Sequence, residues 1–174
     1  MNSPYQGRFK ITQTFKGASH DGLDLVGIDS KEIHATISGV VQYAGWENAA
    51  NHSQGFGQYV CIKGTDGRFY YYGHLSELKV KTGQAVKITD VVGIEGYTGY
   101  TIPSGPNGQH CHYCIRPRYT AGCYLDVTAI SGIPNVLGGV YDDGYRPGQT
   151  SEKKKVKVTI EIDDHKYSGL LEET

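Results

Sequence analysis

Short β-type segments separated by glycine dominate the first two thirds of this chain and restrict it to a β fold. Glycine supplies 24 of the 174 residues, about twice its usual share of ~7%. No window has the 3.6-residue periodicity of a helix. The segments rich in β-branched and aromatic residues are 33–46, 58–62, 68–75, 85–94 and 110–116. We therefore predict one mainly β domain, with antiparallel sheets packed face to face over residues 8 to about 118.

The last third of the chain has a different amino-acid composition. Polar and turn-forming residues fill 141–155, and after them apolar and polar residues alternate from Val156 to Ile162. This pattern predicts a main domain over 1–140, a linker over 141–155 and a short C-terminal β-hairpin extension over 156–174. A single hairpin cannot bury a core by itself, so it should dock or pair elsewhere.

Charge and targeting signals exclude several classes of function. The chain has 17 basic and 18 acidic side chains, which gives no reason to expect nucleic acid as a partner. The first residues lack a basic stretch followed by an apolar run, and no segment is apolar enough to span a membrane. We expect a soluble chain without a signal peptide and without membrane insertion. Its four cysteines are expected to be reduced thiols, with a disulfide left open if the protein works outside a cell.

Three histidine-containing fragments stand out at 19–24, 72–75 and 109–112. Side chains two apart on a strand point to the same face, so His110 and His112 should stand ~6–7 Å apart above one cleft. Both imidazoles could bind one metal. Alternatively, one binds the metal while its neighbour acts on a proton of the bound water.

His20 and Asp24 could join such a site only if the backbone bends between them. A straight strand would separate them by ~13 Å, and Asp21-Gly22 offers the bend. Two histidines and one aspartate around Zn²⁺ leave an open position for water, whose pKa falls to near 7. Taken alone, His20 and Asp24 would suit a surface ion pair slightly better than a pair of metal ligands.

In this order, the fragments resemble the lysostaphin-type (LytM-like) zinc endopeptidases of peptidoglycan. The family pattern is H-x-G-x-D, then G-H-L or A-H-L after an aromatic strand, then H-L-H-F-E. This chain has H-D-G-L-D at 20–24, G-H-L at 73–75 and H-C-H-Y-C at 110–114. Further family-like segments are 37–41, 55–60 and 80–86. The resemblance covers about residues 8–118.

The resemblance implies a role for each residue of the motifs. His20, Asp24 and His112 would hold one Zn²⁺ per chain. His110 would be the general base, and His74 would donate a hydrogen bond to the tetrahedral intermediate or steady the base. The remaining histidines, His34, His52 and His165, are expected to be ordinary solvated or hydrogen-bonded side chains.

The chain departs from the family pattern at two cysteines. Cys111 stands in place of Leu and should point into the core. Cys114 stands in place of Glu, on the face of the two strand histidines, where it could pack inertly, support a ligand or act as an inhibitory fourth ligand. Tyr72 has the parity of His74 and is predicted to line the cleft, in reach of substrate.

These observations favour a zinc endopeptidase that cuts the stem peptide or the cross-bridge of bacterial peptidoglycan and so lyses the wall. It would be made in the cytoplasm and act as a phage or prophage endolysin after holin-type release, or on a phage particle. Two other functions compete: an inactive family member that binds peptidoglycan or a partner, and a phage tail structural module. The sequence assigns no oligomeric state.

Overall fold

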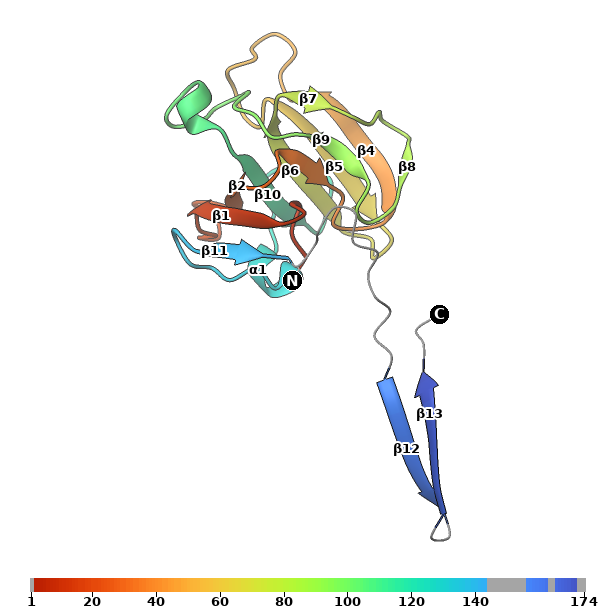
Figure 1. Ribbon diagram of the computed structural model, residues 1–174. Helices are drawn as coiled ribbons and strands as arrows, with labels where there is room; N and C mark the ends of the chain where they lie inside the picture. Colours follow the sequence, from red (N-terminus) through yellow and green to blue (C-terminus); the bar gives the residue numbers. More distant parts are fainter. Residues whose placement is uncertain (1, 144–155, 163–164, 172–174) are drawn as a thin grey trace.

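An eight-stranded antiparallel sheet forms the body of the computed structural model, which describes residues 2–143, 156–162 and 165–171 (Figure 1). Its order is β11-β1-β2-β10-β6-β5-β4-β8, and a smaller sheet has the order β3-β9-β7. The strands of the large sheet are β1 (Arg8–Gln13), β2 (Gly22–Gly27), β4 (Gly39–Trp46), β5 (Gln58–Gly64), β6 (Phe69–Leu75), β8 (Ala85–Val86), β10 (Cys111–Arg116) and β11 (Val140–Asp142). Those of the small sheet are β3 (Glu32–His34), β7 (Glu77–Leu78) and β9 (Val91–Ile94).

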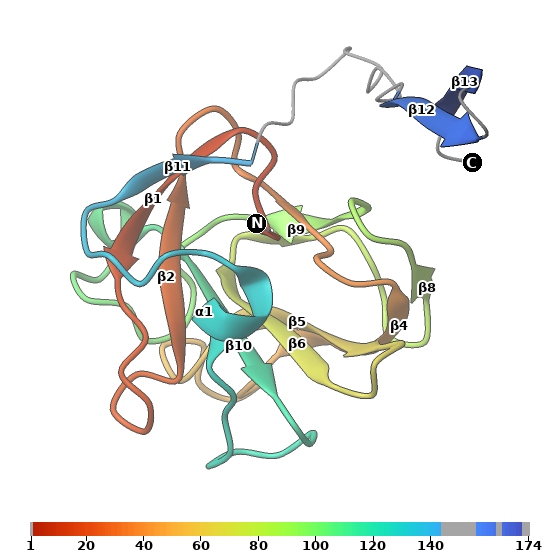
Figure 2. The same ribbon diagram turned by 90° about the horizontal axis from the view of Figure 1, so that it is seen from below.

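The two sheets pack face to face around one hydrophobic core, as the sequence predicted. Ile33 and Val92 of the small sheet share a buried cluster with Val41, Ile62 and Leu75 of the large one. Figure 2 shows β9 facing β5 and β6 across this core. The predicted segments 33–46 and 85–94 are each divided in two, by a bend within 35–38 and a turn within 87–90.

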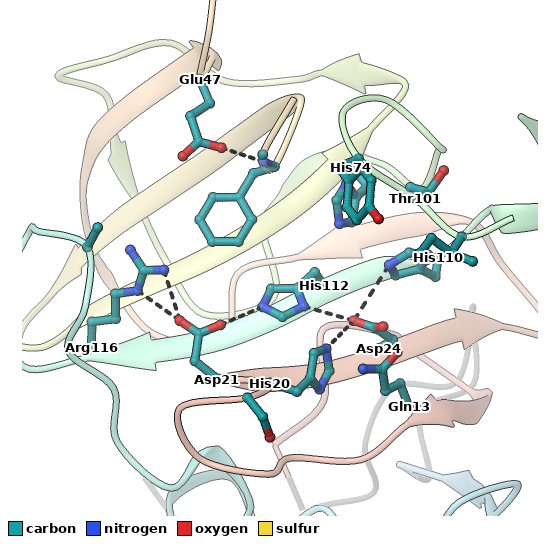
Figure 3. A pocket seen from close by; sticks show the side chains of 16 residues that line it. Gln13, His20, Asp21, Asp24, Glu47, His74, Thr101, His110, His112 and Arg116 are labelled. Carbon is teal, nitrogen blue, oxygen red and sulfur yellow. Dashed lines mark hydrogen bonds and ion pairs between the residues drawn. The ribbon is translucent and has the colours of Figure 1, made fainter. Parts of the chain in front are cut away.

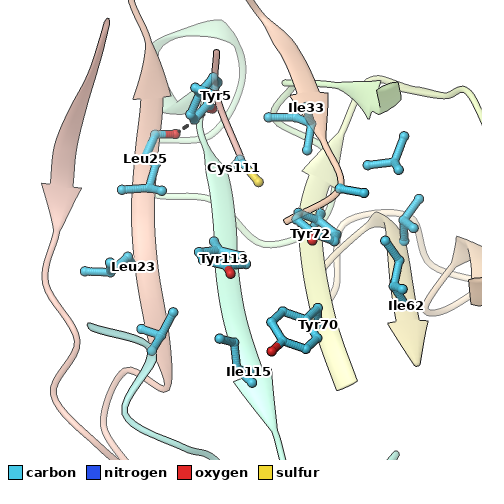
Figure 4. Packing of buried hydrophobic residues seen from close by; sticks show 14 of the residues in the cluster. Tyr5, Leu23, Leu25, Ile33, Ile62, Tyr70, Tyr72, Cys111, Tyr113 and Ile115 are labelled. Carbon is cyan, nitrogen blue, oxygen red and sulfur yellow. Dashed lines mark hydrogen bonds between the residues drawn. The ribbon is translucent and has the colours of Figure 1, made fainter. Parts of the chain in front are cut away.

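Strand β10 lies in the middle of the large sheet, between β2 and β6, and separates the core from the opposite face. Cys111, Tyr113 and Ile115 are fully buried on the core side (Figure 4). Tyr113 stacks on Tyr72 with ring centroids 5.5 Å apart. Both phenol hydroxyls meet Thr36 Oγ1, at 2.9 and 2.7 Å. The expectation that Cys111 is a core residue is confirmed.

The chain after β10 returns to the far edge of the sheet. A short helix, α1 (Val127–Ser131), begins at Asp126, whose carboxylate accepts hydrogen bonds from the amides of Thr128 and Ala129. β11 then pairs with β1, so the first residues of the expected linker belong to a strand. Residues 144–155 of that linker lie outside the described residues.

The expected C-terminal hairpin is present as two paired strands. β12 (Val156–Ile162) and β13 (His165–Leu171) are antiparallel, from Val156 opposite Leu171 to Ile162 opposite His165. The predicted turn at 163–164 lies outside the described residues. Across the described parts of the chain, no helix is long and apolar enough to cross a lipid bilayer.

Candidate metal and catalytic site

Sheet pairing brings together two residues that lie 88 positions apart in the sequence. Asp24 of β2 stands directly opposite His112 of β10, and cross-strand neighbours of this kind have their Cβ atoms about 5 Å apart. His112 Nδ1 lies 2.8 Å from Asp24 Oδ1 (Figure 3). Both residues are buried on the face opposite the core, with side chains 7% and 11% exposed.

The bend that the sequence required before β2 is present and delivers His20 to the same place. Gly17 and His20 form an isolated bridge, and β2 begins only at Gly22. His20 Nε2 consequently lies 3.1 Å from Asp24 Oδ1. One donor atom each from His20, Asp24 and His112 lies within 4.8 Å of the other two.

Gly22 makes room for the His112 ring. A Cβ at this position would stand 2.6 Å from the Tyr113 carbonyl oxygen and 2.7 Å from His112 Nε2. The glycine of the H-x-G-x-D motif therefore allows β2 to approach the imidazole closely.

His110 and His74 complete the cluster from the other side of Asp24. His110 Nε2 lies 3.5 Å from Asp24 Oδ1, and the rings of His110 and His74 are 4.6 Å apart between centroids. His74 has a φ of +61°, which is rare for a residue with a side chain. The structure thus brings together all five residues that the resemblance assigned to the site.

Tyr72 does not line the cleft, and that prediction is wrong. Its side chain is fully buried in the core, where its hydroxyl contacts Thr36. Register with β10 places Gly73, and not Tyr72, beside His112. Strict alternation would place Tyr72 and His74 on the same face of β6. The positive φ of His74 turns its side chain to the cleft, while Tyr72 stays on the core face.

Backbone carbonyls fix the tautomer of three of the four histidines. In each case Nδ1 lies 2.7–2.8 Å from a carbonyl oxygen. A carbonyl oxygen only accepts, so Nδ1 carries the proton and Nε2 of the neutral ring keeps its lone pair. The pairs are His20 with Thr14, His74 with Thr98, and His110 with Gly108.

The ionisable groups of the cluster shift one another's pKa values. Burial opposes ionisation of Asp24, but contacts of its carboxylate with His112 and His20 hold the pKa of that carboxyl well below its usual range. Burial likewise opposes protonation of His112, yet hydrogen bonds to Asp21 and Asp24 raise its pKa well above the usual value. The site therefore favours positive charge between its carboxylates, which is what a bound cation would supply in place of that proton.

His74 responds differently because no carboxylate contacts it directly. Burial and the neighbouring His110 lower the pKa of His74 to about 4. The ring is neutral at pH 7 as a result.

These side chains line a cleft of about 550 Å³. Gln13, Glu47 and the loop 100–102 form its rim, and Phe56 packs against His112 with ring centroids 5.4 Å apart. Ile102 of the rim is 77% exposed. An apolar wall beside a polar cluster suits a peptide ligand.

Asp21 and Arg116 also line the cleft, although the sequence motifs do not predict them as site residues. Asp21 Oδ1 lies 3.2 Å from His112 Nε2, and its Oδ2 lies 2.9 Å from Arg116 Nη2. The sequence predicts Asp21 only as part of the bend, and the one signal for a further role is its place inside the H-x-G-x-D motif. Arg116 shares the strand parity of His112, and that parity was the only signal for it.

Cys114 lies beside the site, as expected from its parity. It is fully buried among Tyr59, Cys61 and Tyr71. Its sulfur, Asp21 and His112 form a second group whose donor atoms lie within 4.8 Å of one another. Two of the remaining histidines are outside the cleft: His34 Nδ1 meets the Thr89 carbonyl, and His52 stacks on Trp46. The side chain of His165 is outside the described residues.

Comparison with known proteins gives one family and several related structures. A model of peptidase family M23 matches residues 18–123. The antimicrobial peptidase lysostaphin from Staphylococcus simulans is 25% identical, with a TM-score of 0.58, over 74% of this chain and 50% of that chain. Its catalytic domain alone is matched over 92% of its length, at 25% identity and a TM-score of 0.56.

A variant of the prophage-encoded M23 protein EnpA from Enterococcus faecalis is 26% identical, with a TM-score of 0.56, over 72% of this chain and 94% of that chain. Comparison with curated proteins finds no match. The chain spans half of full-length lysostaphin and nearly all of the two catalytic domains. Since the family model covers well over half of the sequence and the fold agrees, this chain belongs to peptidase family M23, among its lysostaphin-type members.

Proposed function

We propose that this chain is a zinc-dependent endopeptidase that hydrolyses peptide bonds in the stem peptide or cross-bridge of bacterial peptidoglycan. The observation that carries the proposal is the convergence of His20, Asp24 and His112 on one point of a cleft that also holds His74 and His110. Membership of family M23 and the likeness to lysostaphin support a peptidase.

His20, Asp24 and His112 would hold the metal ion. Two imidazole nitrogens and one carboxylate oxygen form a donor set that suits Zn²⁺ and leaves a fourth position open. The Asp24 carboxylate, whose pKa lies well below its usual range, stays ionised and suits the same cation. When bound, such a cation lowers the pKa of a coordinated water toward neutrality and polarises a carbonyl group.

His110 would act as the general base. The Gly108 carbonyl holds Nδ1–H, so the Nε2 lone pair points into the cleft, 3.5 Å from Asp24 Oδ1. A base needs a free lone pair within hydrogen-bond reach of the proton that it takes. His110 would receive that proton from water and return it to the amine that leaves the scissile bond.

His74 would steady the base. Its Nδ1–H is held by the Thr98 carbonyl, so the neutral ring offers an acceptor and no donor to the cleft. Nε2 of His74 can therefore accept a hydrogen bond from His110 once His110 is protonated. This geometry favours the second of the two roles that the resemblance implied.

Two measurements test the proposal together. EDTA should abolish the clearing of purified peptidoglycan by the full chain, and Zn²⁺ should restore it. His110→Ala should lower the rate by about 10²–10⁴-fold with zinc content unchanged, because it removes the base and no ligand. His52→Ala, which changes a histidine outside the cleft, is the matched control.

Other outcomes would point to the competing functions. A wild-type chain that purifies with far less than one zinc and clears no type of peptidoglycan would be a binding protein and not an enzyme. If His110→Ala kept wild-type activity, the assignment of the base would be wrong. The place of action, after holin-type release or on a phage particle, stays a prediction.

A further inference from the structure

His112 contacts a second carboxylate on the edge of its ring that faces away from Asp24. Nδ1 lies 2.8 Å from Asp24 Oδ1, and Nε2 lies 3.2 Å from Asp21 Oδ1 (Figure 3). The ring thus spans two carboxylates, of which only Asp24 belongs to the proposed ligand set.

Asp21 is itself held in place by Arg116. Two guanidinium nitrogens, Nη2 and Nε, lie 2.9 and 3.3 Å from Asp21 Oδ2. The guanidinium lies over the rings of Tyr71 and Phe56, at 4.7 and 5.2 Å, and its side chain is only 11% exposed. Arg116 therefore occupies one oxygen of Asp21 and leaves the other for His112.

We propose that Asp21 is a positioning residue for His112, clamped by Arg116, and the inference rests on the metal site proposed above. A carboxylate only accepts hydrogen bonds, so Asp21 would keep the proton on Nε2 and leave Nδ1 as the nitrogen that gives up its proton to a metal ion held by Asp24 and His20. Carboxylate–histidine pairs of this kind orient metal-bound imidazoles and raise their basicity.

The arrangement is the reverse of that found for the other three histidines. There, backbone carbonyls hold Nδ1–H and leave Nε2 free. At His112 the backbone of Gly22 packs beside Nε2, where a Cβ would stand only 2.7 Å from this nitrogen. The partner of Nε2 is the side-chain carboxylate of the preceding residue, Asp21.

The donor atoms of Asp21, His112 and Cys114 also lie close enough together to suggest a second cation site. The contacts oppose this alternative. Arg116 places a positive charge on Asp21, and a cation there would require His112 to lose both ring protons. We therefore expect one cation per chain, and a count of bound zinc ions tests this expectation.

The experiment measures zinc affinity of the full-length chain by competition with a chromophoric chelator. Asp21→Asn should weaken zinc binding by about 10–100-fold. The matched control is Asp29→Asn, since Asp29 forms a similar pair with Arg8, 2.7 Å between Arg8 Nη2 and Asp29 Oδ1, away from the cleft. This control should bind zinc as the wild type does.

A second readout separates positioning from mere stabilisation. In the zinc-loaded wild type, the Nε2 proton of His112 should give an NMR signal protected from exchange, and Asp21→Asn should shift it and speed its exchange. If Asp21→Asn does not fold, Arg116→Lys replaces it. That variant keeps the charge, loses the two-nitrogen contact and should weaken zinc binding by about 3–10-fold.

Three results would overturn the inference. Equal zinc affinity and an unchanged Nε2 signal in Asp21→Asn would show that Asp21 positions nothing. Two zinc ions per wild-type chain, with the second lost in Cys114→Ser, would show that Asp21 is a ligand. A wild-type chain that binds no zinc would remove the metal site itself, and this failure of the proposed function is seen before any variant is made.

Discussion

At the scale of residues, the chemistry of the cleft depends on the hydrogen-bond partner that fixes the tautomer of each histidine, as well as on the positions of the histidines. The motifs predicted the five polar residues of the cluster, because their order and flanks are visible in the sequence. They did not predict the tautomers. The carbonyls of Thr14, Thr98 and Gly108 lie in segments between strands, whose path depends on the rest of the fold. No side-chain pattern in these segments predicts the carbonyl contacts.

His74 gives a prediction for the pH dependence of stability in the cation-free protein. Its pKa is about 4 in the folded chain, because of burial and His110, against a usual 6.5. Between these values the unfolded chain binds a proton that the folded chain does not, so this residue makes stability rise with pH from about 4 to 6.5. Denaturant unfolding of His74→Gln in EDTA should show a shallower rise over that range.

The control for this measurement is His52→Gln, which changes a histidine outside the cleft. Its stability should follow the wild-type curve across the same pH range. Parallel curves for His74→Gln and the wild type would mean that His74 titrates normally, and the neutral acceptor role proposed for it would have to be abandoned.

At the scale of elements, β10 and β6 show where sequence periodicity works and where it stops. Residues 111–116 of β10 alternate between the core and the opposite face as predicted, because its pairing with β2 and with β6 runs without a register shift. β6 has the same central position, but its alternation ends at His74. The Phe56 carbonyl accepts the His74 amide there and the register with β5 shifts, and neither event leaves a mark in the sequence.

Tyr72→Phe tests the corrected place of Tyr72. Its hydroxyl meets the Thr36 amide at 2.9 Å and Thr36 Oγ1 at 2.7 Å inside the core. Removing it leaves a buried amide without that partner, which should cost about 1–3 kcal/mol of unfolding free energy. Zinc affinity and peptidoglycan clearing should not change. A loss of activity at unchanged stability would indicate that the Tyr72 side chain lies in the cleft and not in the core.

At the scale of the whole molecule, the core formed by the described side chains lies within the first 143 residues. Its buried members run from Tyr5 to Ile133, and Tyr141 of β11 packs against them. Tyr141 contacts the buried Phe9 with ring centroids 6.3 Å apart. β11 covers an edge of the large sheet by pairing with β1, whereas β12 pairs with β13.

A pair of truncations separates these two contributions. A chain that ends at residue 143 should unfold within about 0.5 kcal/mol of the full chain and bind zinc equally well. A chain that ends at 139 loses the pairing of β11 with β1 and the packing of Tyr141 on Phe9. It should be less stable by on the order of 2 kcal/mol in urea unfolding. Equal stability of the two truncations would show that β11 is no part of the catalytic domain. A loss of zinc binding in both would show that the residues after 143 help to build the metal site.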